Sequence, residues 1–178
     1  MMNDSRKALV LGLIALTAIV RIAPHPLNFT PAGALALFAG AHLRDRRLAY
    51  MAPLVAMLLG DLVIGFHPMM PVVYACLAAT VGIGELIGAH RKKFLPVAGA
   101  ALAASVLFFV VTNFAWWALG GAYPANSTGL AACFVAGIPY FRNTLASDAL
   151  YTAMLFGGMA LAERRFPGLT EVPIRNGR

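Results

Sequence analysis

Two aspartates lie inside long apolar segments of the sequence, where an ionised side chain is unfavourable. Asp61 and Asp148 are both surrounded mainly by apolar residues. An unpaired charge at the centre of a bilayer costs about 2.5–3.5 kcal/mol on insertion scales, so each carboxylate is expected to face a cation, a water-filled cavity or the interior of a helix bundle. Arg21 and Arg142 are the cations expected at a similar depth. Two interpretations stay open: an Asp–Arg pair that joins helices, or carboxylates that bind a ligand.

The last apolar segment, 143–162, is amphipathic where it begins. At about 100° per residue, one face of a helix collects Asn143, Thr144, Ser147, Asp148 and Tyr151. A polar face this marked is not expected to contact lipid. Further along, the same face carries Met154, Leu155 and Gly158. The pattern therefore predicts a pocket that is open at the outer side and closed below, rather than a pore.

Other side chains that could contact a small molecule are expected on the same side of the membrane. Segment 21–31 contains three prolines, which restrict the backbone and would hold its side chains in place. The residues predicted to bind a solute are His25, Asn28, Asp61, His67, Asn113, Trp117, Arg142, Asp148 and Tyr151. Carboxylates would bind donors or a positive group, Arg21 or Arg142 would bind an acidic group, and the aromatic side chains would stack on a ring of the solute.

Metal and enzyme chemistry find little support in the sequence. His25, Asp61, His67 and Cys76 are of types that bind transition metals, but their spacing is irregular. We therefore predict no metal and no other cofactor. Hydrolase, kinase and dinucleotide-binding motifs are absent, so the chain is predicted not to be an enzyme. Energy for any transport would come from an ion gradient or from another chain.

The composition indicates that these residues are positioned by a protein embedded in a membrane. Of 178 residues, 60% are hydrophobic and 12% are charged, against roughly 45–50% and about 25% in soluble proteins. A small soluble domain buries only about two-thirds of its chain's surface, so the excess apolar surface is expected to face lipid. This composition excludes a disordered chain, a coiled coil and a cytosolic enzyme.

Six membrane-spanning helices are expected in one integral membrane domain, followed by a short tail at 163–178. The apolar segments that predict them are 7–23, 31–43, 48–66, 71–89, 95–119 and 143–162. A spanning helix needs roughly 20 residues, which segment 31–43 lacks unless the proline-rich segment before it also enters the membrane. An alternative makes 31–43 a re-entrant segment.

The distribution of basic residues favours six spans with both termini in the cytoplasm. Alternate segments then place 12 of the 14 basic residues inside and leave Arg21 and Arg142 outside. This asymmetry follows the positive-inside rule, and the re-entrant alternative gives a much poorer division of charge. The chain is therefore predicted to be a multi-pass protein of a bacterial inner membrane. The net charge of +7 is assigned to cytoplasmic loops, not to a surface for nucleic acid.

Several longer motifs resemble an uncharacterised family of bacterial membrane proteins that are regarded as transport proteins. The motifs are PHPLNFTP at 24–31, ALALFAG at 34–40, GDLVIGFH at 60–67, TNFAW at 112–116 and GIPYF at 137–141. The size and six-helix layout of that family are similar to those of the substrate-binding S components of energy-coupling factor (ECF) vitamin transporters. Such a component binds a vitamin or a metal near its outer face and docks on a shared transmembrane subunit driven by two ATPases.

This resemblance implies that His25, Asn28, Asp61, His67 and Asn113 line the pocket. We therefore expect an all-α membrane protein that captures a small solute from outside and helps to import it, with the bilayer, the solute and an energising subunit as partners. A solitary proton-coupled transporter, an intramembrane enzyme using His25 or His67 as a base, and a structural membrane subunit are the alternatives.

Overall fold

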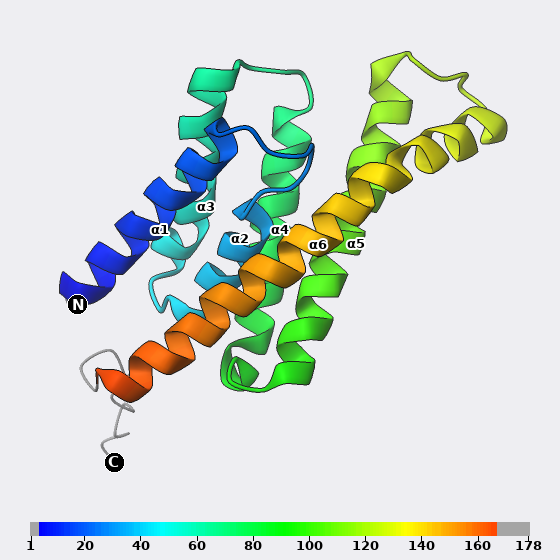
Figure 1. Ribbon diagram of the computed structural model, residues 1–178. Coiled ribbons are helices and arrows are strands. Elements are labelled where there is room, and N and C mark those ends of the chain that lie inside the picture. Colours follow the sequence, from blue (N-terminus) through cyan, green and yellow to red (C-terminus); the bar gives the residue numbers. More distant parts are fainter. Residues whose placement is uncertain (1–3, 167–178) are drawn as a thin grey trace.

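The computed structural model of the protein describes residues 4–166, which form six α-helices and one 3₁₀ helix and no strand (Figure 1). In chain order these are α1 (Asp4–Ile22), α2 (Ala32–His42), α3 (Arg46–Ile64), α4 (Met70–Ile87), η1 (Gly88–His90), α5 (Phe94–Gly120) and α6 (Ser127–Arg165). The all-α prediction is confirmed, and the first five predicted segments agree with α1 to α5 within a few residues. Most of the predicted tail lies outside the described residues.

Four of the described helices are long and apolar enough to cross a membrane: α3, α4 together with η1, α5 and α6. Shorter apolar helical stretches occur at Leu11–Ile22 and Ala32–His42. Large apolar side chains cover the outside of the bundle, among them Leu86 at 83% and Leu161 at 68% exposure. Exposed apolar surface on this scale marks a protein that is embedded in a membrane.

Successive helices run in opposite directions. The connections α1–α2, α3–α4 and α5–α6 lie at one end of the bundle (Figure 1). The connections α2–α3 and α4–α5 lie at the other end, together with the start of α1 and the end of α6. Six passes with both termini on one side would need this alternation, and six passes stay a prediction because α2 is short.

Helix α2 lies in the interior of the bundle. It has 11 residues, of which nearly all are buried, and it contacts α3, α4, α5 and α6. Its length of about 16 Å is roughly half of the hydrocarbon core, which is about 30 Å thick. A helix that is apolar on all sides is typical of a buried position, and α2 accordingly provides the centre on which the longer helices pack.

Two glycines allow α2 and α4 to approach each other closely. A Cβ atom on Gly84 of α4 would lie 2.3 Å from the backbone oxygen of Leu37, and one on Gly40 of α2 would lie 2.0 Å from that of Val81. Neither position has room for a larger residue, because the neighbouring atoms belong to the backbone. Small residues at a helix contact allow backbones to meet in this way in membrane proteins.

The predicted start of the last helix at residue 143 is wrong. Helix α6 begins at Ser127 and has 39 residues, a length of about 58 Å, so the predicted long loop reduces to residues 121–126. Pro139 lies inside the helix. A proline removes one helical hydrogen bond and disfavours the helix by roughly 3 kcal/mol, yet the helix continues through this position.

Packing against α5 explains why the helix continues through the proline. The ring of Phe109 on α5 stacks on Phe141 at 4.5 Å between centroids and meets Phe134 edge-on at 5.4 Å. The helix start is capped, because the Asn126 side chain accepts a hydrogen bond from the backbone N–H of Gly129 at 2.9 Å. These contacts, made on both sides of Pro139, offset the lost backbone bond.

The α2–α4 contact predicts a difference between two neighbouring glycines of α4. Gly84→Ala is expected to lower the free energy of unfolding by roughly 1–3 kcal/mol, because the added methyl overpacks the contact. Gly82→Ala is the matched control, since a Cβ there would meet only the Tyr50 hydroxyl at 3.8 Å. Thermal unfolding in a mild detergent measures both, and equal melting temperatures for the two variants would contradict the prediction.

Candidate functional site

A cavity of about 330 Å³ lies between the proline-rich loop 23–31 and helices α3, α4, α5 and α6. We call it the polar cavity, because many of its lining side chains can form hydrogen bonds. These side chains are Arg21, His25, Asn28, Thr30, His67, Thr80, Thr144, Ser147 and Asp148. Four residues predicted to bind a solute, His25, Asn28, His67 and Asp148, therefore surround a single cavity.

The polar face of α6 turns toward the interior, as its periodicity predicted. Thr144, Ser147 and Asp148 are all buried, with at most 8% exposure, and all three line the polar cavity. The hydroxyl of Thr144 donates to the backbone oxygen of Tyr140 at 3.1 Å, one turn earlier in the helix. The inward orientation of this face is confirmed, whereas solute binding by it stays a prediction.

The same helix holds the proline-rich loop over the cavity. Asn143 Nδ2 donates to the backbone oxygen of Leu27 at 2.9 Å, and Ser147 Oγ approaches that of Asn28 at 3.4 Å. Asn28 itself has φ = 63°, a left-handed conformation that few residues other than glycine adopt. Ser147 Oγ also lies 3.0 Å from the backbone oxygen of Thr144, which is its closer acceptor. The loop therefore has a defined shape, given by its prolines, this turn residue and the bond from Asn143.

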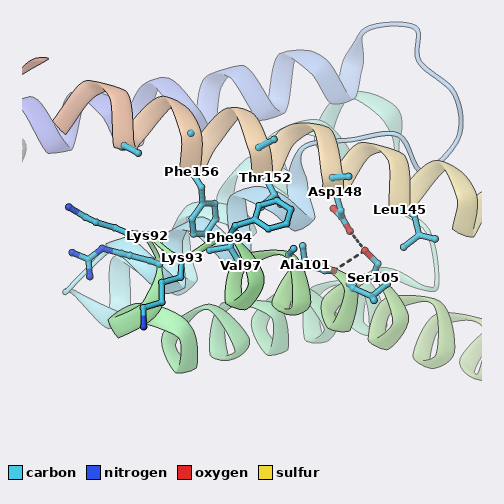
Figure 2. A pocket seen from close by; sticks show the side chains of 17 residues that line it. Lys92, Lys93, Phe94, Val97, Ala101, Ser105, Leu145, Asp148, Thr152 and Phe156 are labelled. Carbon is cyan, nitrogen blue, oxygen red and sulfur yellow. Dashed lines mark hydrogen bonds between the residues drawn. The ribbon is translucent and has the colours of Figure 1, made fainter. Parts of the chain in front are cut away.

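Asp148 is a buried carboxylate with one free oxygen. It is 7% exposed, and its Oδ2 accepts a hydrogen bond of 2.7 Å from the hydroxyl of Ser105 on α5 (Figure 2). Its other oxygen, Oδ1, accepts no hydrogen bond from the described residues and lies beside Gly33, where a Cβ would approach to 2.6 Å. Gly33 also lines the polar cavity, so Oδ1 lies on the cavity side of the carboxylate.

Ser105 is the partner of Asp148 and was not among the candidate site residues predicted from the sequence. It is 1% exposed, and its Oγ lies 3.0 Å from the backbone oxygen of Ala101 as well as 2.7 Å from Asp148 Oδ2, so its single proton is shared between these two acceptors. A signal was available, since Ser105 is the one polar side chain between Phe94 and Val111. A single serine in a long apolar helix is common. Only the contact with Asp148 on α6 distinguishes Ser105 from such serines.

Asp61 is held in an ion pair and does not line the polar cavity. It is 1% exposed, its Oδ1 accepts a hydrogen bond from the guanidinium of Arg21, and its Oδ2 accepts one from the hydroxyl of Tyr74 at 2.7 Å. Gly60 provides room for the arginine, because a Cβ there would lie 2.5 Å from Arg21 Cδ. The Asp–Arg pair considered from the sequence is therefore present, and it joins α1, α3 and α4.

The two histidines at the cavity differ in what their rings can offer a ligand. Both ring nitrogens of His25 face backbone oxygens, Nδ1 that of Pro26 at 3.0 Å and Nε2 that of Arg21 at 3.1 Å, so this ring supports the loop. His67 is exposed at the edge of the cavity. Within residues 4–166, no group of three or more His, Cys, Asp or Glu side chains is placed to hold a metal ion.

Asn113 lies in a neighbouring space of about 690 Å³ between α5, the first half of α6 and the loop 23–31. We call it the aromatic cavity, because its walls include Phe108, Phe109, Trp116, Tyr123, Tyr140 and Phe141. Asn113 Nδ2 donates to the backbone oxygen of Phe109 at 2.7 Å. The two cavities share the lining residues Leu27, Asn28, Phe108 and Thr144, so they are adjacent parts of one hollow region.

Three further predicted residues line neither cavity. Trp117 donates through Nε1 to the backbone oxygen of Pro124 at 3.0 Å and so closes the α5–α6 connection. Arg142 is exposed. Tyr151 meets the ring of Phe29 edge-on, with 5.9 Å between centroids. Trp117 and Tyr151 thus stabilise the loops near the cavities.

The Arg21–Asp61 pair predicts coupled effects on stability. Asp61→Leu leaves a partly buried arginine without its counter-ion and is expected to lower the free energy of unfolding by up to about 3 kcal/mol. In the double variant Arg21→Met, Asp61→Leu, the loss in free energy of unfolding should be smaller than the sum of the losses in the two single variants. Tyr74→Phe is the milder control, since it leaves the ion pair in place. Unfolding in detergent measures all four, and strictly additive losses would show that the pair is not coupled.

Comparisons with known proteins give a family but no activity. Neither the curated proteins nor the solved structures contain a match to the chain. A family model described as a family of unknown function matches residues 2–169, which include the polar cavity, the aromatic cavity and every helix that forms them. The chain therefore belongs to this family of unknown function, DUF6580.

Proposed function

We propose that this protein is the substrate-binding component of a membrane import system and that it captures a small, vitamin-like organic solute in the polar cavity. The observation that carries the proposal is the free Oδ1 oxygen of Asp148, a buried carboxylate that lies against the cavity wall. This oxygen is not fully buried and Asp148 lines the polar cavity, so a donor group on a solute could reach it and form a hydrogen bond. A carboxylate that only joined helices would have both oxygens bonded, as Asp61 has.

The surroundings of Asp148 match the chemistry of a small organic solute. A volume of about 330 Å³ is at the lower end of the range for small-molecule sites, which is roughly 300–1,000 Å³. Polar groups on several elements, among them Asn28, Thr80 and Ser147, alternate with apolar walls such as Ile64 and Phe108. Such sites use apolar surface for affinity and a few placed polar groups for orientation.

The aromatic cavity extends this site in one direction. Because it shares Asn28 and Thr144 with the polar cavity, a solute with a ring could place its polar part beside Asp148 and the ring among the aromatic side chains. Aromatic pairs in offset or edge-on arrangements contribute about 0.5–1.5 kcal/mol beyond the burial of area. The sequence carries no nucleotide-binding motif, so the proposal assigns the energy for import to a separate transmembrane subunit with ATPases.

Asp148→Asn is expected to weaken solute binding about 10- to 100-fold, because a hydrogen bond to a charged group contributes roughly 1.5–3 kcal/mol. Thr152→Val is the matched control on α6, since it removes a buried hydroxyl that lines no part of the polar cavity. The ligand is found by mass spectrometry of small molecules that copurify in mild detergent and by thermal-shift screening of vitamins and nucleobases. A folded Asp148→Asn protein with an unchanged Kd would refute the proposed role of Asp148.

Gly33→Ala tests the same site without removing a charge. The added Cβ would lie 2.6 Å from Asp148 Oδ1, so the carboxylate must move away from its present position. We expect at least a several-fold loss of solute affinity. Gly99→Ala is the control, because a Cβ at Gly99 meets no atom within 4 Å. Equal affinities in the two variants would show that the position of Asp148 does not matter for binding.

Other functions predict other results. Uptake of the solute by vesicles that contain this chain alone, driven by a pH gradient, would indicate a solitary proton-coupled transporter. Turnover that is lost in His25→Ala or His67→Ala, with binding retained, would indicate an intramembrane enzyme. No binding of any screened compound by the folded protein would favour a structural subunit.

A further inference from the structure

Another cavity, of about 660 Å³, opens between α5 and α6 (Figure 2). We call it the lateral groove. Its walls are mainly small or apolar side chains, including Val97, Ala101, Ala153, Phe156 and Gly157. Several lining residues, among them Ala153 and Gly157, are exposed at the surface of the bundle, so the groove is open toward the side that faces lipid.

The groove runs along the helices between two different ends. At one end lie Lys92 and Lys93, and at the other Ser105 and Asp148 bond to each other (Figure 2). Helical residues rise about 1.5 Å each, so the distance from Lys93 to Ser105 is roughly 18 Å. One leaflet of a bilayer has a hydrocarbon thickness of about 15 Å, half of the whole core. The groove therefore has the length of one leaflet.

The end at Lys93 is suited to a negatively charged group. Lys93 is exposed, stands at the N-terminus of α5 without capping that helix through its side chain, and makes no ion pair with the described residues. Lys92 already pairs with Glu163 at 2.6 Å. The N-terminus of a helix carries a partial positive charge and free backbone N–H groups, which bind phosphate readily. The positive charge of Lys93 and the free backbone N–H groups of α5 therefore lie together at the end of the apolar groove.

We propose that the lateral groove binds an anionic phospholipid, with the phosphate at Lys93 and the first turn of α5 and one acyl chain in the groove. Basic pockets between transmembrane helices bind anionic head groups, and here an apolar channel of one leaflet's length continues from such a pocket. The lipid would fill the space between the inner halves of α5 and α6. This site shares only Asp148 with the polar cavity and does not depend on the proposed solute.

Two neighbouring glycines of α6 provide a matched test of the acyl-chain position. A Cβ at Gly157 or at Gly158 meets no atom within 4 Å, so both positions tolerate a side chain, but only Gly157 lines the groove. Gly157→Phe is expected to abolish binding of phosphatidylglycerol, and Gly158→Phe to leave it unchanged. Native mass spectrometry of the full chain in mild detergent, with palmitoyl-oleoyl phosphatidylglycerol added, counts the bound lipid. Ala153→Leu, which also fills the groove, serves as a second variant if Gly157→Phe does not fold.

The head group is tested with Lys93→Gln and with a neutral lipid. Lys93→Gln should lower phosphatidylglycerol binding about fivefold, the effect of one basic residue near a charged membrane surface, whereas Arg47→Gln at the start of α3 should not. Phosphatidylcholine should bind more weakly, and inorganic phosphate should not compete, because the acyl chain contributes. The proposal would be overturned if both lipids bound equally or if inorganic phosphate alone displaced the lipid. It would also be overturned if Gly157→Phe bound lipid as the unchanged protein does and altered only the oligomeric state.

Discussion

A carboxylate inside an apolar helix bundle must find its partners within the bundle, because neither lipid nor bulk water is available to it. Asp61 meets this requirement with Arg21 and Tyr74, which lie on two other helices. Asp148 meets half of it with Ser105, which lies 43 residues away in the sequence. These contacts add specific polar links between helices that pack around α2, and the Arg21–Asp61 pair joins two helices that are not consecutive in the chain.

Glycines make room for the buried polar groups in three places. Arg21 lies over Gly60, Asp148 over Gly33 and Asn113 over Gly137, each so close that a Cβ on the glycine would come within 2.6 Å of a side-chain atom. In every case the glycine and the polar side chain belong to different helices or loops. The small residues of this protein therefore have a double role: they let helices approach, and they let polar groups reach positions between the helices.

The two aspartates are used differently, and this difference supports the functional proposal. Asp61 has both oxygens bonded and stabilises the packing of α1, α3 and α4. Asp148 lines both the polar cavity and the lateral groove, and its partner Ser105 lines the lateral groove. One carboxylate thus separates a space lined by hydrogen-bonding groups from one lined by apolar groups.

The sequence by itself determined the membrane class, the bounds of five helices and the inward direction of the polar face of α6, because hydropathy and the helical period are local properties of the chain. It did not determine where α6 begins, since contacts with Phe109 on another helix outweigh the local effect of Pro139. Nor did it distinguish Asp61 from Asp148: both are acidic residues in apolar helices, and their roles differ only through Arg21 and Ser105, 40 and 43 residues away. Their different roles arise in the tertiary structure, because the groups that stabilise a buried charge are placed beside it only when the chain folds.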